Sequence, residues 1–196
     1  MFAELLRSKL AGIAELSDSQ VTCLHRHYEL LTRWNRVVNL TSVRSIEEAV
    51  ERHYCESVFA GIHLPAGQLS IADIGSGAGF PGIPIAVVRS DCTVALIESH
   101  QRKAAFLKEA AREFPNIRVL SQRAEDVQDH FDWVVSRAVR YTEISSDLKR
   151  LGQYAELLTG EVRPGDLDGF NWRESIHLPW GERRYLLIGV SRGTGS

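Results

Sequence analysis

Long apolar runs, paired cysteines and an excess of one charge are all missing from this chain of 196 residues. The longest apolar stretches, 83–88 and 94–97, fall far short of the roughly 20 residues that a membrane-spanning helix needs. Three cysteines without C-x-x-C spacing offer neither a disulfide framework nor a zinc site, so we expect no metal. The N-terminal stretch lacks the apolar core of a signal peptide, which predicts a reducing, cytoplasmic location.

The charge balance also restricts the partners. Twenty-three basic and 25 acidic residues give a formal net charge of −2, so the chain does not bind nucleic acid as a polycation. A nucleic-acid partner must therefore meet a local basic patch. Arginine far outnumbers lysine, which suits bidentate contacts to phosphate or carboxylate, although a genome-wide Arg bias explains the excess equally well.

The N-terminal part of the chain has helical periodicity. Apolar residues recur every three or four positions over 21–38, which predicts an amphipathic helix that begins near residues 17–18. Ser45 and Glu48 have the spacing of a capping box, in which each side chain bonds the backbone amide of the other residue. A helix to about residue 62 should follow, so we expect residues 1–62 to form a helical cap.

From residue 63 onward, short apolar runs alternate with helical segments, which is typical of a mostly parallel sheet with helices on both faces. The predicted helices are 83–89, 102–114 and 142–152, and the predicted strands are 69–75, 93–99, 117–121, 133–136, 154–159, 171–178 and 185–190. The connection between the last two strands is too short for a crossover helix, so they must pair antiparallel as a hairpin. Residues 63–196 are therefore expected to form one α/β domain.

Residues 71–84 hold the most informative pattern. A buried strand runs through alternate glycines into a helix start, which leaves the backbone bare enough for a nucleotide to approach. Read from Gly77, the glycines match the dinucleotide fingerprint G-x-G-x-x-G, a weak signal by itself. With Asp73 two residues before Gly75, and with Gly79 as the last glycine, they are similar to motif I of S-adenosylmethionine-dependent methyltransferases.

Two further stretches are expected at the same edge of the sheet. Glu98 ends the next predicted strand, 23 residues after Gly75, where a carboxylate can accept both hydroxyls of a ribose. Residues 122–126 follow the third strand, where an adenine ring would rest. Ala124 leaves room for a flat base and Glu125 can contact its edge, although an ordinary polar loop explains them equally well. These positions predict an adenosine ligand and leave its identity open.

Arg137 ends the fourth predicted strand at this edge. Methyltransferases that act on exocyclic amines commonly carry an Asn/Asp-Pro-Pro-aromatic element there, and this chain has Ser136, Arg137 and Ala138 instead. An acceptor with a ready in-plane lone pair, such as a ring nitrogen, needs no base to remove a proton. Arg137 can then hold a phosphate or a purine oxygen by two parallel bonds.

Several stretches together resemble the RsmG (GidB) methyltransferases. The similar stretches are, in order along the chain, 34–43, 52–57, 73–84, 122–125 and 136–138. That family methylates N7 of a guanine in bacterial small-subunit (16S) ribosomal RNA. The resemblance implies a Rossmann-like, S-adenosylmethionine-dependent methyltransferase fold, with a mostly parallel seven-stranded sheet, an antiparallel C-terminal hairpin and an N-terminal helical cap.

The resemblance also implies site residues and partners. Cofactor contacts would fall on Asp73, Gly75, Gly77, Gly79, Phe80, Glu98, Ala124, Glu125 and Arg137, and substrate contacts on Asn39, His53, Arg123 and Arg137. Because guanine N7 carries a lone pair and no proton, we expect no general base and assign Arg137 to orienting the guanine or a flanking phosphate. The expected cofactor is S-adenosylmethionine, the expected partner is 16S ribosomal RNA or the small subunit, and the expected state is a monomer.

The chain departs from the family at three places. Glu56 stands where the family usually has Asp, which re-aims any bond that this carboxylate makes. Thr159 replaces a Lys and removes a phosphate or substrate contact. The segment 161–169 is short, so the helix expected between the fifth and sixth strands is shortened or missing. A catalytically silent relative that binds ribosomal RNA is therefore an alternative, and a nicotinamide-dependent oxidoreductase that uses the weaker glycine fingerprint is another.

The predicted cap carries a local excess of positive charge. Between residues 26 and 44 the arginines outweigh a single acidic residue, Glu29. The arginines are Arg26, Arg33, Arg36 and Arg44. This stretch is predicted to be the face that meets the RNA backbone. An ordinary solvated helix surface is the alternative, because acidic residues cancel the charge soon afterwards.

Overall fold

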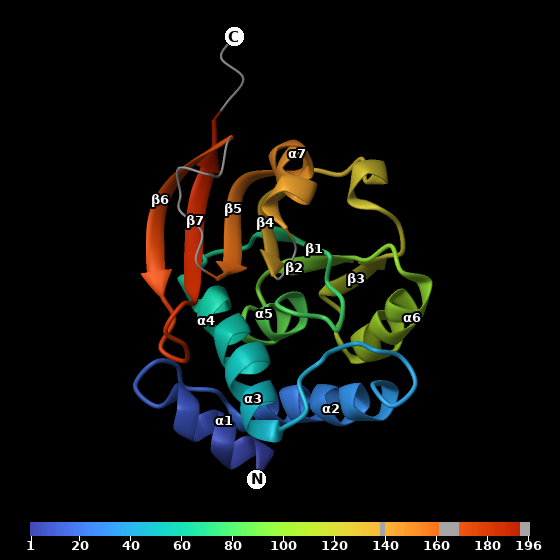
Figure 1. Cartoon of the computed structure of the whole chain (residues 1–196), viewed down its shortest axis with the longest axis vertical. Helices are drawn as coiled ribbons and strands as arrows, with labels where there is room; N and C mark the ends of the chain where they lie inside the picture. The colour runs from blue at the N-terminus through green and yellow to red at the C-terminus, as the bar shows by residue number, and fades with distance from the viewer. Residues whose placement is uncertain (138–139, 161–168, 193–196) are drawn as a thin grey trace.

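A seven-stranded sheet with helices packed around it forms the molecule (Figure 1), and the computed structural model describes residues 1–137, 140–160 and 169–192. The helices are α1 (Phe2–Leu10), α2 (Asp18–Trp34), α3 (Ile46–Ala49), α4 (Glu56–His63), α5 (Gly82–Val88), α6 (Gln101–Ala110) and α7 (Tyr141–Leu151). The π-helical turn η1 (Val50–Cys55) joins α3 to α4, and η2 (Ala111–Glu113) and η3 (Ala124–Asp126) are single 3₁₀ turns. The strands are β1 (Ser70–Ile74), β2 (Thr93–Ile97), β3 (Ile117–Leu120), β4 (Phe131–Arg137), β5 (Gly152–Thr159), β6 (Phe170–His177) and β7 (Tyr185–Ser191).

The strand order is β3-β2-β1-β4-β5-β7-β6. Strands β1 to β5 are parallel, whereas β7 runs antiparallel to both β5 and β6. This arrangement confirms the predicted fold class, including the hairpin that the short last connection requires. The predicted helix at 102–114 ends earlier than expected, at Ala110, and continues as η2.

Alternating side chains of the strands build two apolar cores, because successive residues of a strand point to opposite faces. On β2, Val94 and Leu96 join the core that contains α1, α2, α4, α5 and α6, whereas Ala95 and Ile97 join the core on the face of α7. The helices of residues 1–62 therefore share one continuous core with the sheet. The division into a cap and a methyltransferase domain at residue 62 stays a prediction.

The starts of α2 and α3 confirm the predicted helix caps except for one hydrogen bond. Helix α2 begins at Asp18 as predicted, and Ser17 with Gln20 forms a complete capping box. At α3, Ser45 accepts a hydrogen bond from the Glu48 amide as predicted. The reciprocal bond was predicted wrongly, since within the described part of the chain the Glu48 carboxylate pairs with Arg52 at 2.7 Å instead. A cation one helical turn later competes for this carboxylate.

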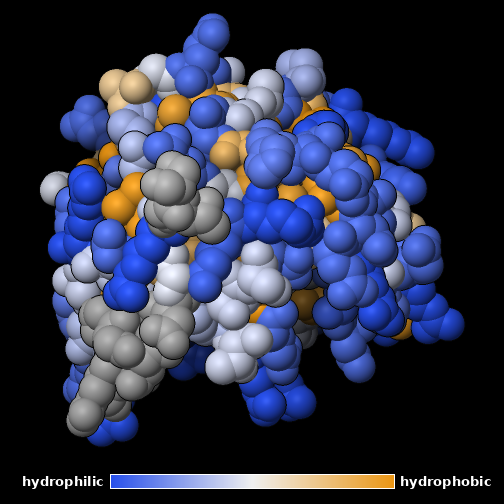
Figure 2. Space-filling view, turned by 90° about the horizontal axis from the view of Figure 1, so that it is seen from above, coloured by the Kyte–Doolittle hydropathy of each residue, from blue (hydrophilic) through white to orange (hydrophobic). Residues whose placement is uncertain are grey.

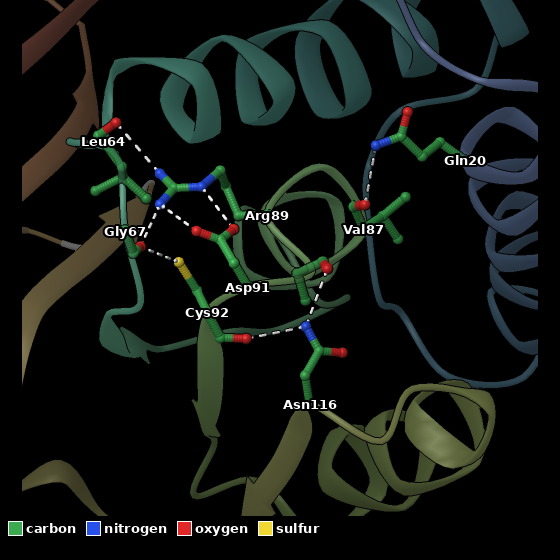
Figure 3. Close-up of polar contacts among 9 residues, drawn as sticks. Gln20, Leu64, Gly67, Val87, Arg89, Asp91, Cys92 and Asn116 are labelled. Atoms are coloured by element: carbon green, nitrogen blue, oxygen red, sulfur yellow. Dashed lines mark hydrogen bonds and ion pairs between the residues drawn. The ribbon is translucent and has the colours of Figure 1, made fainter.

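A cluster of hydrogen bonds fixes the turns at the amino ends of β1 and β2 (Figure 3). Arg89, just after α5, donates to the carbonyls of Leu64 and Gly67, at 3.2 and 2.8 Å, and pairs with Asp91. Asn116 donates to the carbonyls at the end of α5 and the start of β2. This end of the sheet is thereby closed by its own loops, and the carboxyl ends of the strands are left to form a site.

The face seen in Figure 2 is largely hydrophilic, with apolar residues in scattered places. Among the described residues, no helix is long and apolar enough to cross a membrane. The predicted loss of a helix at 161–169 concerns residues that, apart from Gly169, lie outside the described part of the chain, as does Ala138.

Candidate active site

The loop between β1 and α5 needs glycine for its backbone shape. Gly75, Gly77 and Gly79 have φ angles of 72°, 56° and 86°, in the left-handed region that L residues with a side chain rarely adopt. A Cβ atom on Gly79 would lie 2.4 Å from the Ile83 side chain. The alternate glycines therefore bend the chain sharply from the strand into α5, as the sequence pattern predicted.

Asp73 of β1 connects the strand to the start of α5, beyond the glycine loop. Its fully buried carboxylate accepts a hydrogen bond from the Gly82 amide at 2.9 Å, and a Cβ atom on Gly82 would lie 2.7 Å from that oxygen. Burial raises the pKa of Asp73 to about 7, although the Gly82 bond opposes this shift. The other carboxylate oxygen, Oδ1, has no hydrogen-bond partner among the described residues. Asp73 lines neither of the pockets described next, so its direct contact with a cofactor stays a prediction.

Two pockets of opposite charge meet at Gly75. The acidic pocket, of about 410 Å³, lies at the ends of β1, β2 and β3 and beside α7. Its charged lining residues are Glu98, Arg123, Glu125, Glu143 and Asp147. The basic pocket, of about 360 Å³, lies on the other side of the glycine loop. Its lining residues are Leu40, Thr41, Ser42, His53, Gly75, Ser76, Gly77, Ala78, Phe80, Lys103 and Arg137, and no acidic residue of the described chain is among them.

The acidic pocket brings together most of the predicted adenosine contacts. The Glu98 carboxylate accepts from the amides of Gly77, at 3.0 Å, and His100, at 2.7 Å, so it already joins the ends of β1 and β2. Ala124 and Glu125 lie across from it in η3. Arg123, predicted to contact the substrate, also lines this pocket and pairs with Glu125 at 3.3 Å. The structure thus places Arg123 apart from the other predicted substrate residues.

His53 lies at the centre of the basic pocket. Its Nδ1 accepts a hydrogen bond from the Arg137 guanidinium at 2.6 Å, so its Nε2 donates to the Thr41 hydroxyl at 2.7 Å. Its ring stacks on Phe80 with centroids 4.6 Å apart. Burial, assisted by the charge of Arg137, lowers the pKa of His53 to about 3. His53 is therefore neutral, and both of its nitrogens are engaged.

Arg137 lines the same pocket. Burial lowers its pKa to about 10, opposed by the charge of Glu56, so the guanidinium is positive at neutral pH. Its Nη1 is buried and has no hydrogen-bond partner among the described residues. Because buried donors are nearly always bonded, this charged donor would be satisfied by an acceptor that reaches it.

Glu56 carries a contact that the sequence left open. Its fully buried carboxylate pairs with Arg184, which lies just before β7 and donates from Nη2 to Oε2 at 2.6 Å. Burial raises the pKa of Glu56, and the charges of Arg184 and Arg137 oppose this rise. The longer side chain that replaces the family's Asp thus connects the C-terminal hairpin to the helix behind the basic pocket.

Two residues that fix the site's backbone were missed in the sequence. His27 of α2 donates from Nε2 to the Ala78 carbonyl at 3.1 Å and contacts the Tyr54 hydroxyl through Nδ1 at 2.9 Å. Asn35 accepts from the amides of Leu40 and Thr41 and donates to the Thr41 carbonyl. The only signal for His27 was a histidine in the N-terminal helix, and Asn35 lay inside the stretch 34–43.

Asn39, predicted to contact the substrate, is exposed and lines neither pocket, although Leu40 and Thr41 beside it line the basic one. Its role stays a prediction. Thr41 and Lys103 were also missed. Thr41 is in the same stretch as Asn39, and Lys103 comes five residues after Glu98, in the first turn of α6. Both lie in the basic pocket together with His53 and Arg137, which were predicted.

The model of the GidB family, described as rRNA small subunit methyltransferase G, matches residues 20–161. The chain belongs to this family. The ribosomal RNA small subunit methyltransferase G of Chromobacterium violaceum is 40% identical over 149 residues, which cover 74% of this chain and 70% of the relative. That of Nitrosomonas europaea is 45% identical over 140 residues, 68% of this chain and 64% of the relative. These matches confirm the predicted GidB membership and the enzyme class.

Solved structures with low sequence identity support the fold. An S-adenosylmethionine-dependent methyltransferase from Aquifex aeolicus superposes with a TM-score of 0.59 at 14% identity, covering 82% of this chain and 98% of its own. The magnesium protoporphyrin IX methyltransferase ChlM from Synechocystis, with bound S-adenosylmethionine, gives 0.55 at 16% identity, covering 96% and 90%. With the GidB membership, they confirm S-adenosylmethionine as the cofactor.

Proposed function

We propose that this GidB-family methyltransferase transfers a methyl group to N7 of a guanine in 16S ribosomal RNA. The observation that supports it most is the chemistry of the basic pocket, where a charged Arg137 with bonding capacity to spare lies beside a neutral His53. This pocket can hold an electron-rich base, and the one imidazole among its described lining residues, His53, has both nitrogens engaged.

The acidic pocket and the glycine loop fit S-adenosylmethionine. Glu98 is the carboxylate proposed for the ribose hydroxyls, and Ala124 and Glu125 would contact the adenine. At Gly77, an added Cβ would meet only the Gly75 carbonyl within 4 Å, so the bare backbone leaves space on the ligand side. The Oδ1 atom of Asp73, which has no partner among the described residues, adds a buried polar group beneath the loop. When bound, the cofactor supplies a methyl group on a positively charged sulfur.

The residues of the basic pocket would position the guanine. A guanine presents N7 and O6 as neighbouring acceptors, and arginine commonly bonds both. We propose that Arg137 donates to O6 or to a flanking phosphate, because a bond to N7 would occupy the lone pair that must attack the methyl group. His53 holds Arg137 through its Nδ1 and is itself fixed by Thr41. Holding the reacting atoms in line accounts for the rate, and no general base takes part.

Methylation of defined RNA tests this proposal. The purified protein is incubated with labelled S-adenosylmethionine and with either naked 16S ribosomal RNA or small subunits from a strain that lacks the enzyme. The digested RNA is then analysed by nucleoside. The proposal predicts label in 7-methylguanosine, and faster transfer to subunits than to naked RNA, because folded RNA is recognised by shape. Label in another nucleoside would contradict N7 specificity. Binding of the RNA without label would instead support a catalytically silent relative.

A further inference from the structure

The four arginines of the cap line two different hollows, with Arg26 and Arg33 in one and Arg36 and Arg44 in the other. Arg26 pairs with Glu113 at 3.0 Å. Arg33 lines a hollow of about 330 Å³ between α2 and α6, together with Arg26, Arg112 and three acidic residues of α2, α6 and η2. The acidic residues are Glu29, Glu109 and Glu113. A phosphate near this pair meets as many negative as positive groups, so this side of α2 is a poor place for RNA.

Arg36 and Arg44 are in a different environment. Both are exposed, and neither forms an ion pair with any residue that the structure describes. They line a groove of about 260 Å³ between the end of α2 and the segment that leads into α3. Within the described chain, the groove has no acidic lining residue; its polar residues are Tyr28, Thr32, Asn35, Thr41 and Ser45. An unpaired arginine at each side of a polar groove suits a phosphate diester.

The groove and the basic pocket share Thr41 as a wall. Thr41 is held on the pocket side by the His53 side chain and on the groove side by Asn35. The groove therefore adjoins the pocket that contains Lys103 and Arg137, and neither has an acidic residue among its described lining residues. The acidic pocket lies on the other side of Gly75, where it repels phosphate.

We propose that the Arg36–Arg44 groove binds the phosphate backbone of the RNA strand next to the target nucleotide. This proposal rests on the proposed function, because it takes RNA as the substrate. The strand is held outside the basic pocket by Arg36 and Arg44, while Lys103 and Arg137 hold the nucleotide within it. The negative charge of the acidic pocket keeps the strand from the cofactor's place.

The test compares two double variants with equal charge change. Arg36→Ala/Arg44→Ala removes the groove arginines, and Arg26→Ala/Arg33→Ala removes the two arginines of α2 that line the hollow between α2 and α6. Binding of 16S ribosomal RNA is measured from about 50 to about 200 mM salt with S-adenosylhomocysteine present. The groove variant should bind at least about tenfold more weakly at low salt, with a log–log salt slope smaller by about two, since each phosphate contact contributes roughly one. The control variant should keep the wild-type slope.

Calorimetric titration with S-adenosylhomocysteine checks both variants and should give the wild-type affinity. An unchanged salt slope in the groove variant, or an equal loss in the control, would overturn the proposal. So would a wild-type protein that does not bind the RNA. If the groove variant shows the smaller salt slope but the wild type transfers no methyl group, the proposed function fails and the proposal of an RNA-binding groove is kept. If the wild type methylates RNA and the groove variant keeps both slope and rate, only the groove proposal fails.

Discussion

The two pockets that meet at Gly75 differ in charge and in the way their walls are built. The acidic pocket is made from the ends of three adjacent strands and the loops that follow them, with carboxylates such as Glu98 bonded to the local backbone. The basic pocket combines segments that are far apart in the chain, from Thr41 to Arg137, and its polar side chains bond one another. A small adenosine ligand needs a pre-formed strand edge, whereas a polyanionic substrate needs cations gathered from several elements.

The difference extends to what supports each pocket. Behind the basic pocket, the buried Glu56 forms an ion pair with the partly exposed Arg184, which connects the first part of the chain to the C-terminal hairpin. The acidic pocket is supported at its rim by Arg150, which donates to the carbonyls of Ala124 and Val127 from the adjacent helix α7. Substitutions that displace the C-terminal hairpin should therefore disturb the basic pocket more than the acidic pocket.

The largest expected effect is on stability, from Glu56→Ala. This change removes the negative group that balances the buried charge of Arg137, and it leaves the partly exposed Arg184 without its partner, so the free energy of unfolding should fall by about 3–5 kcal/mol. Urea unfolding measures the change. The matched control is Glu48→Ala, which breaks an exposed pair with Arg52 and should cost less than about 1 kcal/mol. Equal losses of unfolding free energy in the two variants would show that the Glu56–Arg184 ion pair contributes no more to stability than the exposed pair does.

Arg137→Ala should have the largest effect on catalysis. Removing a positioned charged donor typically lowers kcat by about 100- to 1000-fold, and here it also frees Nδ1 of His53. Initial rates at saturating donor measure kcat, and thermal unfolding verifies the fold. Arg123→Ala, in the acidic pocket, serves as the control and should change kcat by less than about fivefold, because its pair with Glu125 is exposed. A larger effect at Arg123 would reverse the assignment of the two pockets.

Glu98→Ala should instead weaken the cofactor. Charged hydrogen bonds are worth about 1.5–3 kcal/mol, so the Kd for S-adenosylhomocysteine should rise about 10- to 100-fold. The rise includes the loss of the bond that holds the Gly77 amide. Titration calorimetry gives the Kd, and Glu125→Ala, on the exposed rim, should raise it less. If Glu98→Ala lowers kcat at saturating donor and leaves Kd unchanged, the ribose assignment is wrong.

The last expected effect is a pH dependence of stability that comes from His27. Burial lowers its pKa to about 4, from an ordinary value near 6.5 in the unfolded chain. Between these values the unfolded state binds more protons than the folded one, so stability falls as the pH falls, by about 1.4 kcal/mol per unit for this histidine. His27→Gln should lessen that slope between pH 6.5 and 4, measured by urea unfolding. Equal slopes in the wild type and in His27→Gln would contradict a buried neutral His27.

Local patterns explain why so much of the fold was predictable. The strands, the glycine loop and the hairpin depend on residues close together in the sequence, and the ends of parallel strands meet at one edge whatever else the chain does. Glu98 and Ala124 were therefore placed correctly beside the loop.

The rest of the site depends on contacts between distant residues. Glu56 and Arg184 are 128 residues apart, and nothing near either of them indicates the other. The substrate contact of Asn39 stays a prediction, and the residue of the same stretch that bonds His53 is Thr41. The excess of arginine in the cap was visible in the sequence, whereas the acidic surroundings of Arg26 and Arg33 depend on Glu109 of α6 and Glu113 of η2.

Titration of the wild-type protein with S-adenosylhomocysteine and with NAD, in separate calorimetric experiments, tests most directly that the acidic pocket and the glycine loop take the methyl donor. S-adenosylhomocysteine should bind at one site per chain, Glu98→Ala should weaken it, and NAD should give no heat of binding. Binding of NAD without binding of S-adenosylhomocysteine would contradict the assignment and favour the oxidoreductase alternative.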